Sequence, residues 1–91
     1  MPELFRFFGF VFFFYSREHE PLHVHVEGNG GSAKFNYDCN AVKFVLAESK
    51  GIKQNDLKRI QRVVDENTDL IILRWFKYFV DEDDIEDILY R

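Results

Sequence analysis

The chain has 91 residues, which is enough for one small domain (residues 1–91) that buries about two thirds of its unfolded surface. With 46% hydrophobic and 31% charged residues, it has the composition of a globular protein. The net charge of −4 disfavours non-specific binding to RNA, which depends on basic groups. The most apolar run, residues 4–15, is too short to span a membrane and contains Arg6, so no membrane association is expected.

A single cysteine, Cys39, cannot form an internal disulfide, which is typical of the reducing cytoplasm. The sequence shows no secretory signal, so a cytoplasmic location is expected. No basic residue adjoins Cys39, and we therefore expect a buried, structural thiol rather than a reactive one.

Two aromatic segments begin the chain. Residues 4–8 form either a short strand or an extended arm. Gly9 separates them from residues 10–15, which are rich in β-forming residues and apolar on both faces, as a central strand is. Residues 16–21 are polar and end in Pro21, which predicts a turn.

The next segments alternate with a period of two. Residues 23–27 alternate polar and apolar side chains and predict a strand with one buried face. The Gly-Asn-Gly-Gly sequence at 28–31 predicts a hairpin turn, because Gly and Asn tolerate positive φ. The remaining sheet is predicted as a strand at 32–37, a turn at 38–40, a strand at 42–47 and an end at Lys50-Gly51, so that it covers about residues 4–48.

Helical periodicity follows, over about residues 55–90. Asn55 is a suitable N-cap, and Asp56 lies in the first turn, where the helix dipole favours negative charge. Leu57, Ile60, Val63, Val64 and Ile71 form an apolar stripe, and Trp75 is expected in the core. Residues 67–69 predict a break and a second helix, and residues 81–84 predict a cap for a short third one. The fold class is α+β: an antiparallel sheet of three to five strands, followed by two or three C-terminal helices packed on one face.

The alternation at 23–27 assigns side chains to faces. Val24 and Val26 share the face that the helices cover, so His23 and His25 point to the opposite face. Their expected cross-strand neighbours are Lys34 and Asn36, and the first long strand adds either Phe10, Phe12 and Phe14 or Val11, Phe13 and Tyr15. An uncovered face that carries such aromatics favours a homodimer or a small protein partner.

The three histidines, His19, His23 and His25, lie within seven residues. Imidazole is the commonest metal ligand, and nearby glutamates could complete a divalent metal site such as a zinc site. These glutamates are Glu18, Glu20 and Glu27. Because nothing downstream supplies a further ligand, no cofactor is expected, and zinc remains the alternative.

The same residues suit metal-free RNA cleavage. One imidazole would accept the 2′-hydroxyl proton and another would protonate the leaving oxygen. Lys34, or Arg17 in the predicted turn, would stabilise the charge on phosphorus. The candidate catalytic residues are therefore His19, His23, His25 and Lys34. The structural alternative is a polar strand and turn whose histidines are half-exposed or contact a partner.

The histidine segment also carries a family resemblance. The sequence Glu18-His19-Glu20-Pro21-Leu22-His23-Val24-His25 follows an aromatic strand and precedes a Gly-rich turn with Ala33-Lys34-Phe35. It resembles a bacterial family, the domain of unknown function 4160, whose hallmark is a histidine, a proline turn and a His-x-His strand. The resemblance spans roughly residues 4–79 and includes Val64, Glu66, Asn67, Leu70 and Trp75. The chain departs from it at Leu22, where the family often has a second proline, and at Ile52-Lys53, where it often has Leu-Pro.

The resemblance implies a small bacterial protein encoded beside another small domain of unknown function, in arrangements similar to toxin–antitoxin pairs. We therefore expect a protein-binding component of such a module. The alternatives are a histidine-dependent ribonuclease-type toxin and a metal-binding protein. Whether the chain is an enzyme is left open.

Overall fold

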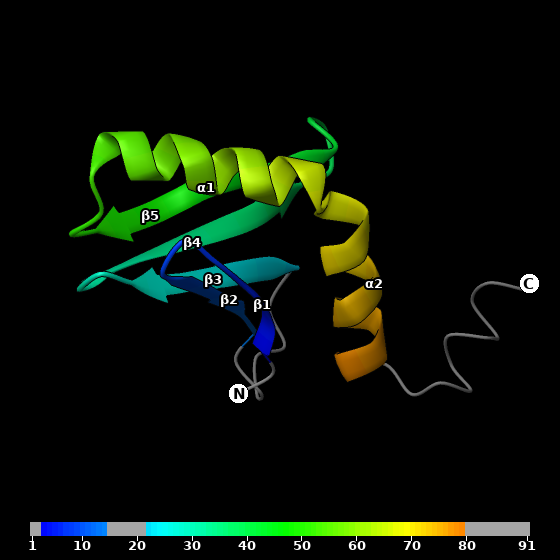
Figure 1. Cartoon of the computed structure of the whole chain (residues 1–91). Coiled ribbons are helices and arrows are strands. Elements are labelled where there is room, and N and C mark those ends of the chain that lie inside the picture. The colour runs from blue at the N-terminus through cyan, green and yellow to red at the C-terminus, as the bar shows by residue number, and fades with distance from the viewer. Residues whose placement is uncertain (1–2, 15–21, 80–91) are drawn as a thin grey trace, which may run out of the picture.

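The computed structural model describes residues 3–14 and 22–79, which form five strands followed by two helices (Figure 1). The strands are β1 (Glu3–Phe7), β2 (Phe10–Phe13), β3 (His23–Gly28), β4 (Gly31–Asp38) and β5 (Lys43–Lys50). The helices are α1 (Gln54–Glu66) and α2 (Thr68–Phe79). The predicted α+β class, with an antiparallel sheet that precedes C-terminal helices, is confirmed.

The sheet is an antiparallel meander in the order β1-β2-β3-β4-β5. The segment predicted as a strand or an arm is therefore a strand, β1. Since each strand pairs with its neighbours in sequence, β1 and β5 are the two edges of the described sheet. The turn predicted at residues 16–21 lies outside the described residues.

Two hairpins close with two-residue turns of positive φ, the geometry that matches the twist of the flanking strands. Asn29 (φ 50°) and Gly30 (φ 78°) connect β3 to β4, as the sequence predicted. Phe8 (φ 35°) and Gly9 (φ 89°) connect β1 to β2, and this conformation is uncommon for a residue as bulky as phenylalanine. Gly28 approaches this turn so closely that an added Cβ would lie 2.2 Å from the Gly9 carbonyl oxygen.

Both helices pack on one face of the sheet. In Figure 1, α1 runs alongside β5 and α2 turns away from it. Side chains from β2, β3, β4, β5 and both helices form the core between them. Its buried members are Phe10, Phe12, Phe14, Val24, Val26, Ala33, Phe35, Phe44, Ile60, Val63, Val64 and Ile71. The apolar stripe predicted for the helices is thus confirmed, and Trp75 packs against this core while staying partly exposed.

The helix boundaries agree with the sequence at one end only. Asn67 ends α1, where its Nδ2 donates to the Val63 carbonyl oxygen at 2.7 Å, and α2 begins at the next residue, as predicted. Asn55 is not the N-cap. The N-cap is Lys53, which has an extended backbone and whose side chain makes no capping hydrogen bond. Asp56 lies in the first turn, as predicted. The cap predicted at residues 81–84 lies outside the described residues.

Cys39 is exposed, so the expectation of a buried thiol is wrong. It lies in the turn between β4 and β5, where Asp38 Oδ1 accepts hydrogen bonds from the backbone N–H groups of Asn40 and Ala41 at 2.8 and 3.2 Å. Tight turns project their side chains into solvent, and an apolar residue type does not change that.

Candidate functional site

The two described histidines lie on the sheet face opposite the helices. On β3, Val24 and Val26 enter the core, so the intervening His23 and His25 point the other way. The β3–β4 register places His23 opposite Asn36 and His25 opposite Lys34, as predicted. The imidazole ring centroids lie 4.9 Å apart with the rings nearly perpendicular, at 86°.

β2 adds Phe13 to this face. Phe13 pairs with His25 across β2 and β3, and the two rings stack with centroids 5.6 Å apart and an interplanar angle of 23°. Val11 lies on the same side, opposite Glu27. Of the two sets that the sequence left open, Val11 and Phe13 accompany the histidines. Tyr15 lies outside the described residues.

The aromatic part of this face is not open surface. Phe13 is 2% exposed and His23 is 4% exposed, so the expectation of uncovered aromatics beside the histidines is wrong at these positions. Within the described part of the chain, no buried side-chain nitrogen or oxygen lacks a hydrogen-bond partner. The burial of His23 favours a structural role over one that requires access to a ligand. His25 alone of the pair stays partly exposed.

An open hollow of about 350 Å³ borders His25. We call it the β3–β5 hollow. Its side chains come from three adjacent strands and alternate in charge. They are His25, Glu27, Ser32, Lys34, Glu48 and Lys50. In the register, Lys34 lies between His25 and Glu48, and Ser32 lies between Glu27 and Lys50. Two carboxylates and two ammonium groups give this hollow no net charge, so it suits a polar or zwitterionic group better than a polyanion.

A second hollow of about 380 Å³, which we call the hairpin hollow, lies at the other end of β5. It is lined by the β4 end and the turn together with Val45, Leu46 and Ala47. Val45 and Leu46 are 41% and 38% exposed, which is unusual for aliphatic residues on a strand next to the core.

Both hollows border β5, whose far side from β4 is the outer edge of the described sheet. At the start of β5, Gln61 Nε2 of α1 donates to the Phe44 carbonyl oxygen at 3.1 Å. From Val45 to Lys50 every residue is exposed, and no strand of the described residues pairs with this edge. Unpaired backbone N–H and C=O groups on an edge strand are a template for a further strand.

The other predicted site residues cannot be placed relative to the β3–β5 hollow. His19, Arg17, Glu18 and Glu20 lie outside the described residues. Among residues 3–14 and 22–79, no three His, Cys, Asp or Glu side chains come together as metal ligands do. His23 and His25 therefore supply at most two imidazoles of a metal site, and zinc commonly needs three or four protein ligands.

Sequence reasoning missed Val45, Glu48 and Lys50. Val45 lies in the strand predicted at residues 42–47, whereas Glu48 and Lys50 lie beyond it, in the part of β5 that the prediction left out. Only the strand order shows that this strand lies at the sheet edge. The one available signal was the polar composition of residues 47–50, which is typical of an edge strand rather than a central one.

Neither described helix is both long and apolar enough to cross a bilayer. No curated relative and no solved structure matches the chain. A family model does match: the domain of unknown function DUF4160 covers residues 9–76, about three quarters of the chain. These residues run from the β1–β2 turn to the second half of α2, so they include both hollows and the His-x-His strand. The chain therefore belongs to the DUF4160 family.

Proposed function

We propose that the protein is a protein-binding component of a small two-protein module, and that its partner adds a strand to the open edge of β5. The observation that carries the proposal is the exposed run from Val45 to Lys50, whose outer edge pairs with no strand of the described residues and which borders a hollow at each end. In strand addition, main-chain hydrogen bonds supply affinity, and pockets for alternate side chains supply specificity. The β3–β5 hollow and the hairpin hollow are suited to such side chains.

The edge favours a different protein over a second copy of this chain. If two β5 strands paired antiparallel about their middle, Lys43 of one copy would lie opposite Lys50 of the other, and like charges directly opposite are destabilising. The register shift opposite Lys34 and Phe35 also leaves an extra residue, Ala47, in β5. Bulges and edge lysines are devices that prevent an edge from pairing with itself.

The family resemblance suggests which protein to test. The product of the adjacent gene is the expected partner, in a module similar to toxin–antitoxin pairs. A partner strand with carboxylates near its ends would complement Lys43 and Lys50. This charge pattern is absent from β5 itself, whose ends are both lysine.

The ribonuclease alternative is less well supported. Acid–base cleavage with two imidazoles requires that both reach the RNA. His23 is 4% exposed, which leaves His25 as the accessible one of the two described imidazoles, with Lys34 opposite it. The hollow beside them carries no net positive charge. These observations support binding over catalysis.

Co-expression with the adjacent gene product tests the proposal. Val45→Glu places a charge on the β5 edge and is expected to weaken the complex at least tenfold in a titration by calorimetry, about 1.4 kcal/mol. Val42→Glu is the matched control. Val42 is 67% exposed in the preceding turn, so the same substitution there leaves the affinity unchanged.

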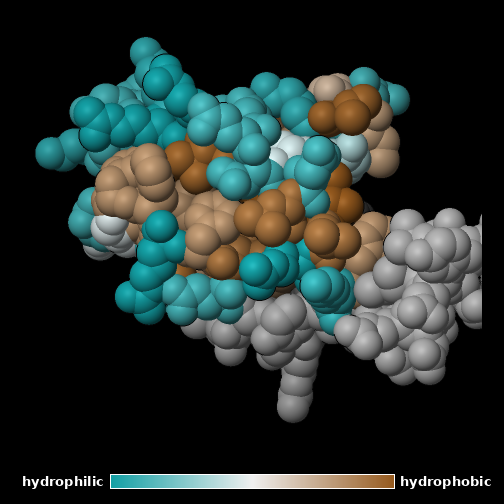
Figure 2. All heavy atoms as spheres, turned by 45° about the vertical axis from the view of Figure 1, so that its right-hand side comes forward, coloured by the Kyte–Doolittle hydropathy of each residue, from teal (hydrophilic) through white to brown (hydrophobic). Residues whose placement is uncertain are grey.

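A third variant separates this edge from another apolar surface. Figure 2 shows apolar atoms gathered in a band on the side of the molecule where α2 comes forward. The exposed leucines of α2 are Leu70 and Leu73, at 38% and 50%. Leu73→Glu is expected to bind normally. A complex that survives Val45→Glu and is lost with Leu73→Glu would move the interface to α2, and failure to form any complex would refute the binding role.

A further inference from the structure

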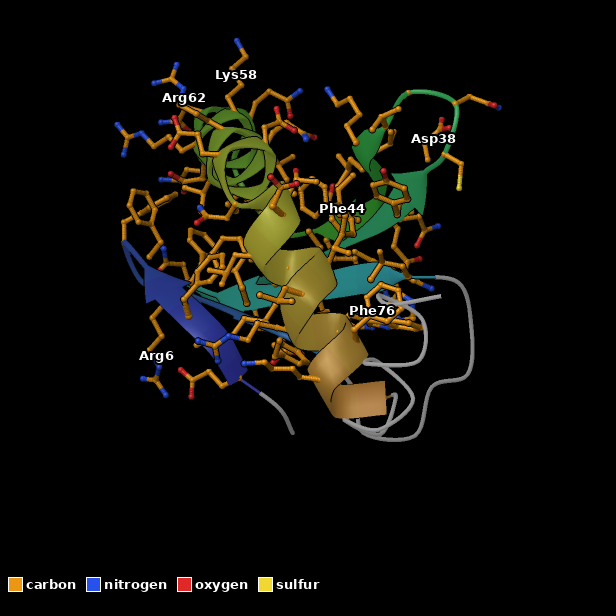
Figure 3. The ribbon with its side chains drawn as sticks, turned by 90° about the vertical axis from the view of Figure 1, so that its right-hand side faces the viewer. Arg6, Asp38, Phe44, Lys58, Arg62 and Phe76 are labelled. Carbon is orange, nitrogen blue, oxygen red and sulfur yellow. The ribbon has the colours of Figure 1, made fainter. Side chains whose placement is uncertain are left out.

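The outer face of α1 is strongly basic and lies apart from both hollows. Lys58, Arg59 and Arg62 form this basic face, and all three are exposed. Figure 3 shows Lys58 and Arg62 pointing away from the sheet. None of the three makes an ion pair with any described residue. The carboxylates of α1 flank the basic face. Asp56 lies in the first turn, and Asp65 and Glu66 lie at the end of the helix, where Asp65 Oδ1 accepts a hydrogen bond from Gln61 Nε2 at 2.9 Å.

An aromatic surface continues the basic face. The Arg59 guanidinium carbon lies 5.8 Å from the centroid of the Phe8 ring, within the range of a cation–π contact. Phe8 holds a positive φ of 35° in the β1–β2 turn, and its ring meets that of Phe7 edge to face at 4.6 Å. Phe7 is 46% exposed. Arg59 thus joins the basic face to the Phe8 and Phe7 rings, a combination that suits a ligand with carboxylates and an apolar side chain.

We propose that the basic face binds the acidic segment of the same chain, residues 81–87. This segment, Asp-Glu-Asp-Asp-Ile-Glu-Asp, carries six carboxylates and one isoleucine. Residues 3–14 and 22–79 carry ten Lys and Arg against eight Asp and Glu, so the described body is slightly basic while the segment is strongly acidic. The charges are complementary, and the isoleucine complements Phe7.

The connection is long enough for an intramolecular contact. Arg62 and Phe79 are separated by 17 positions, so their separation is at most about 26 Å even if α1 and α2 were collinear. Figure 1 shows α2 turned away from the α1 axis, which shortens that separation. Asp87 is eight residues beyond Phe79, and eight residues extend up to about 27 Å. The contact would shield the basic face from other anions. It is independent of the proposed β5 interface, which uses neither the basic face nor the acidic segment.

Zero-length carbodiimide cross-linking of the full chain tests the proposal, because it joins amines only to carboxylates in contact. The expected product is an amide between Lys58 and a carboxylate of residues 81–87, found by mass spectrometry in the monomer band. Charge reversal at Arg59→Glu and Arg62→Glu should lower its yield at least fivefold, and 0.5 M NaCl should do the same by screening. Circular dichroism confirms that the variants fold.

Lys43 and Lys50, which are exposed on β5, are the internal controls for non-specific linking. A yield at Lys58 no higher than at these two lysines would overturn the proposal. So would a yield that charge reversal leaves unchanged. Cross-links found only in a covalent dimer would assign the contact to a second copy and would overturn the intramolecular assignment.

Discussion

Alanine substitution should separate the two histidines of β3. His23→Ala removes an imidazole that is 4% exposed and leaves a cavity. Truncation of a large buried side chain to alanine costs about 3 kcal/mol. For a domain of this size the melting temperature falls by roughly 15 °C. His25→Ala removes a partly exposed ring and its stacking on Phe13, which is worth about 1 kcal/mol.

Urea unfolding provides the assay. The fluorescence of Trp75, the single tryptophan, reports on the packing of α2 against the core. His23→Gln retains a donor and an acceptor, so it should recover part of the stability that His23→Ala loses. Equal destabilisation by His23→Ala and His25→Ala, or a larger effect at His25, would refute the structural role assigned to His23.

Further substitutions test the rest of the fold. Gly28→Ala should cost about 3 kcal/mol in chemical denaturation, because its Cβ would lie 2.2 Å from a backbone oxygen. Gly30→Ala has open space around the added Cβ and should cost about 1 kcal/mol because of its positive φ. Equal losses of stability in the two variants would contradict this reasoning. Phe35→Ala, at a fully buried position, should cost about 4 kcal/mol in the same assay. The hydrogen bond from Arg6 lowers the pKa of Glu3, so this pair stabilises the fold at neutral pH and loses its effect as the pH falls through that pKa. Because the pair is exposed, its contribution is small, and Glu3→Gln should lower the melting temperature at pH 7 only slightly and leave it unchanged at a pH below the pKa of Glu3.

The face assignments could be predicted because they depend only on local alternation. The pattern at residues 23–27 separated His23 and His25 from Val24 and Val26, and the Gly-rich turn fixed the hairpin register that brings Lys34 opposite His25. Side-chain period and turn chemistry are properties of a few adjacent residues, so the sequence contains them directly.

Burial and edge position could not be predicted in this way. The sequence placed His23 on the far face and left the face of Phe13 open. It predicted neither the 2% exposure of Phe13 nor the 4% exposure of His23, because burial depends on tertiary packing. The start of α1 was misplaced because Asn55 is a better cap than Lys53 by residue type, while the chain geometry after Gly51 decides the boundary. The exposed edge of β5 follows from the strand order, which non-local pairing determines.

Hydrogen exchange with and without the adjacent gene product tests the central claim most directly. If the partner adds a strand to β5, the backbone amides of residues 45–50 that face outward should exchange at least tenfold more slowly in the complex. The amides of β1, at the opposite edge of the sheet, should be unaffected. Protection confined to α2, or a complex that forms with no protection of β5, would contradict the account.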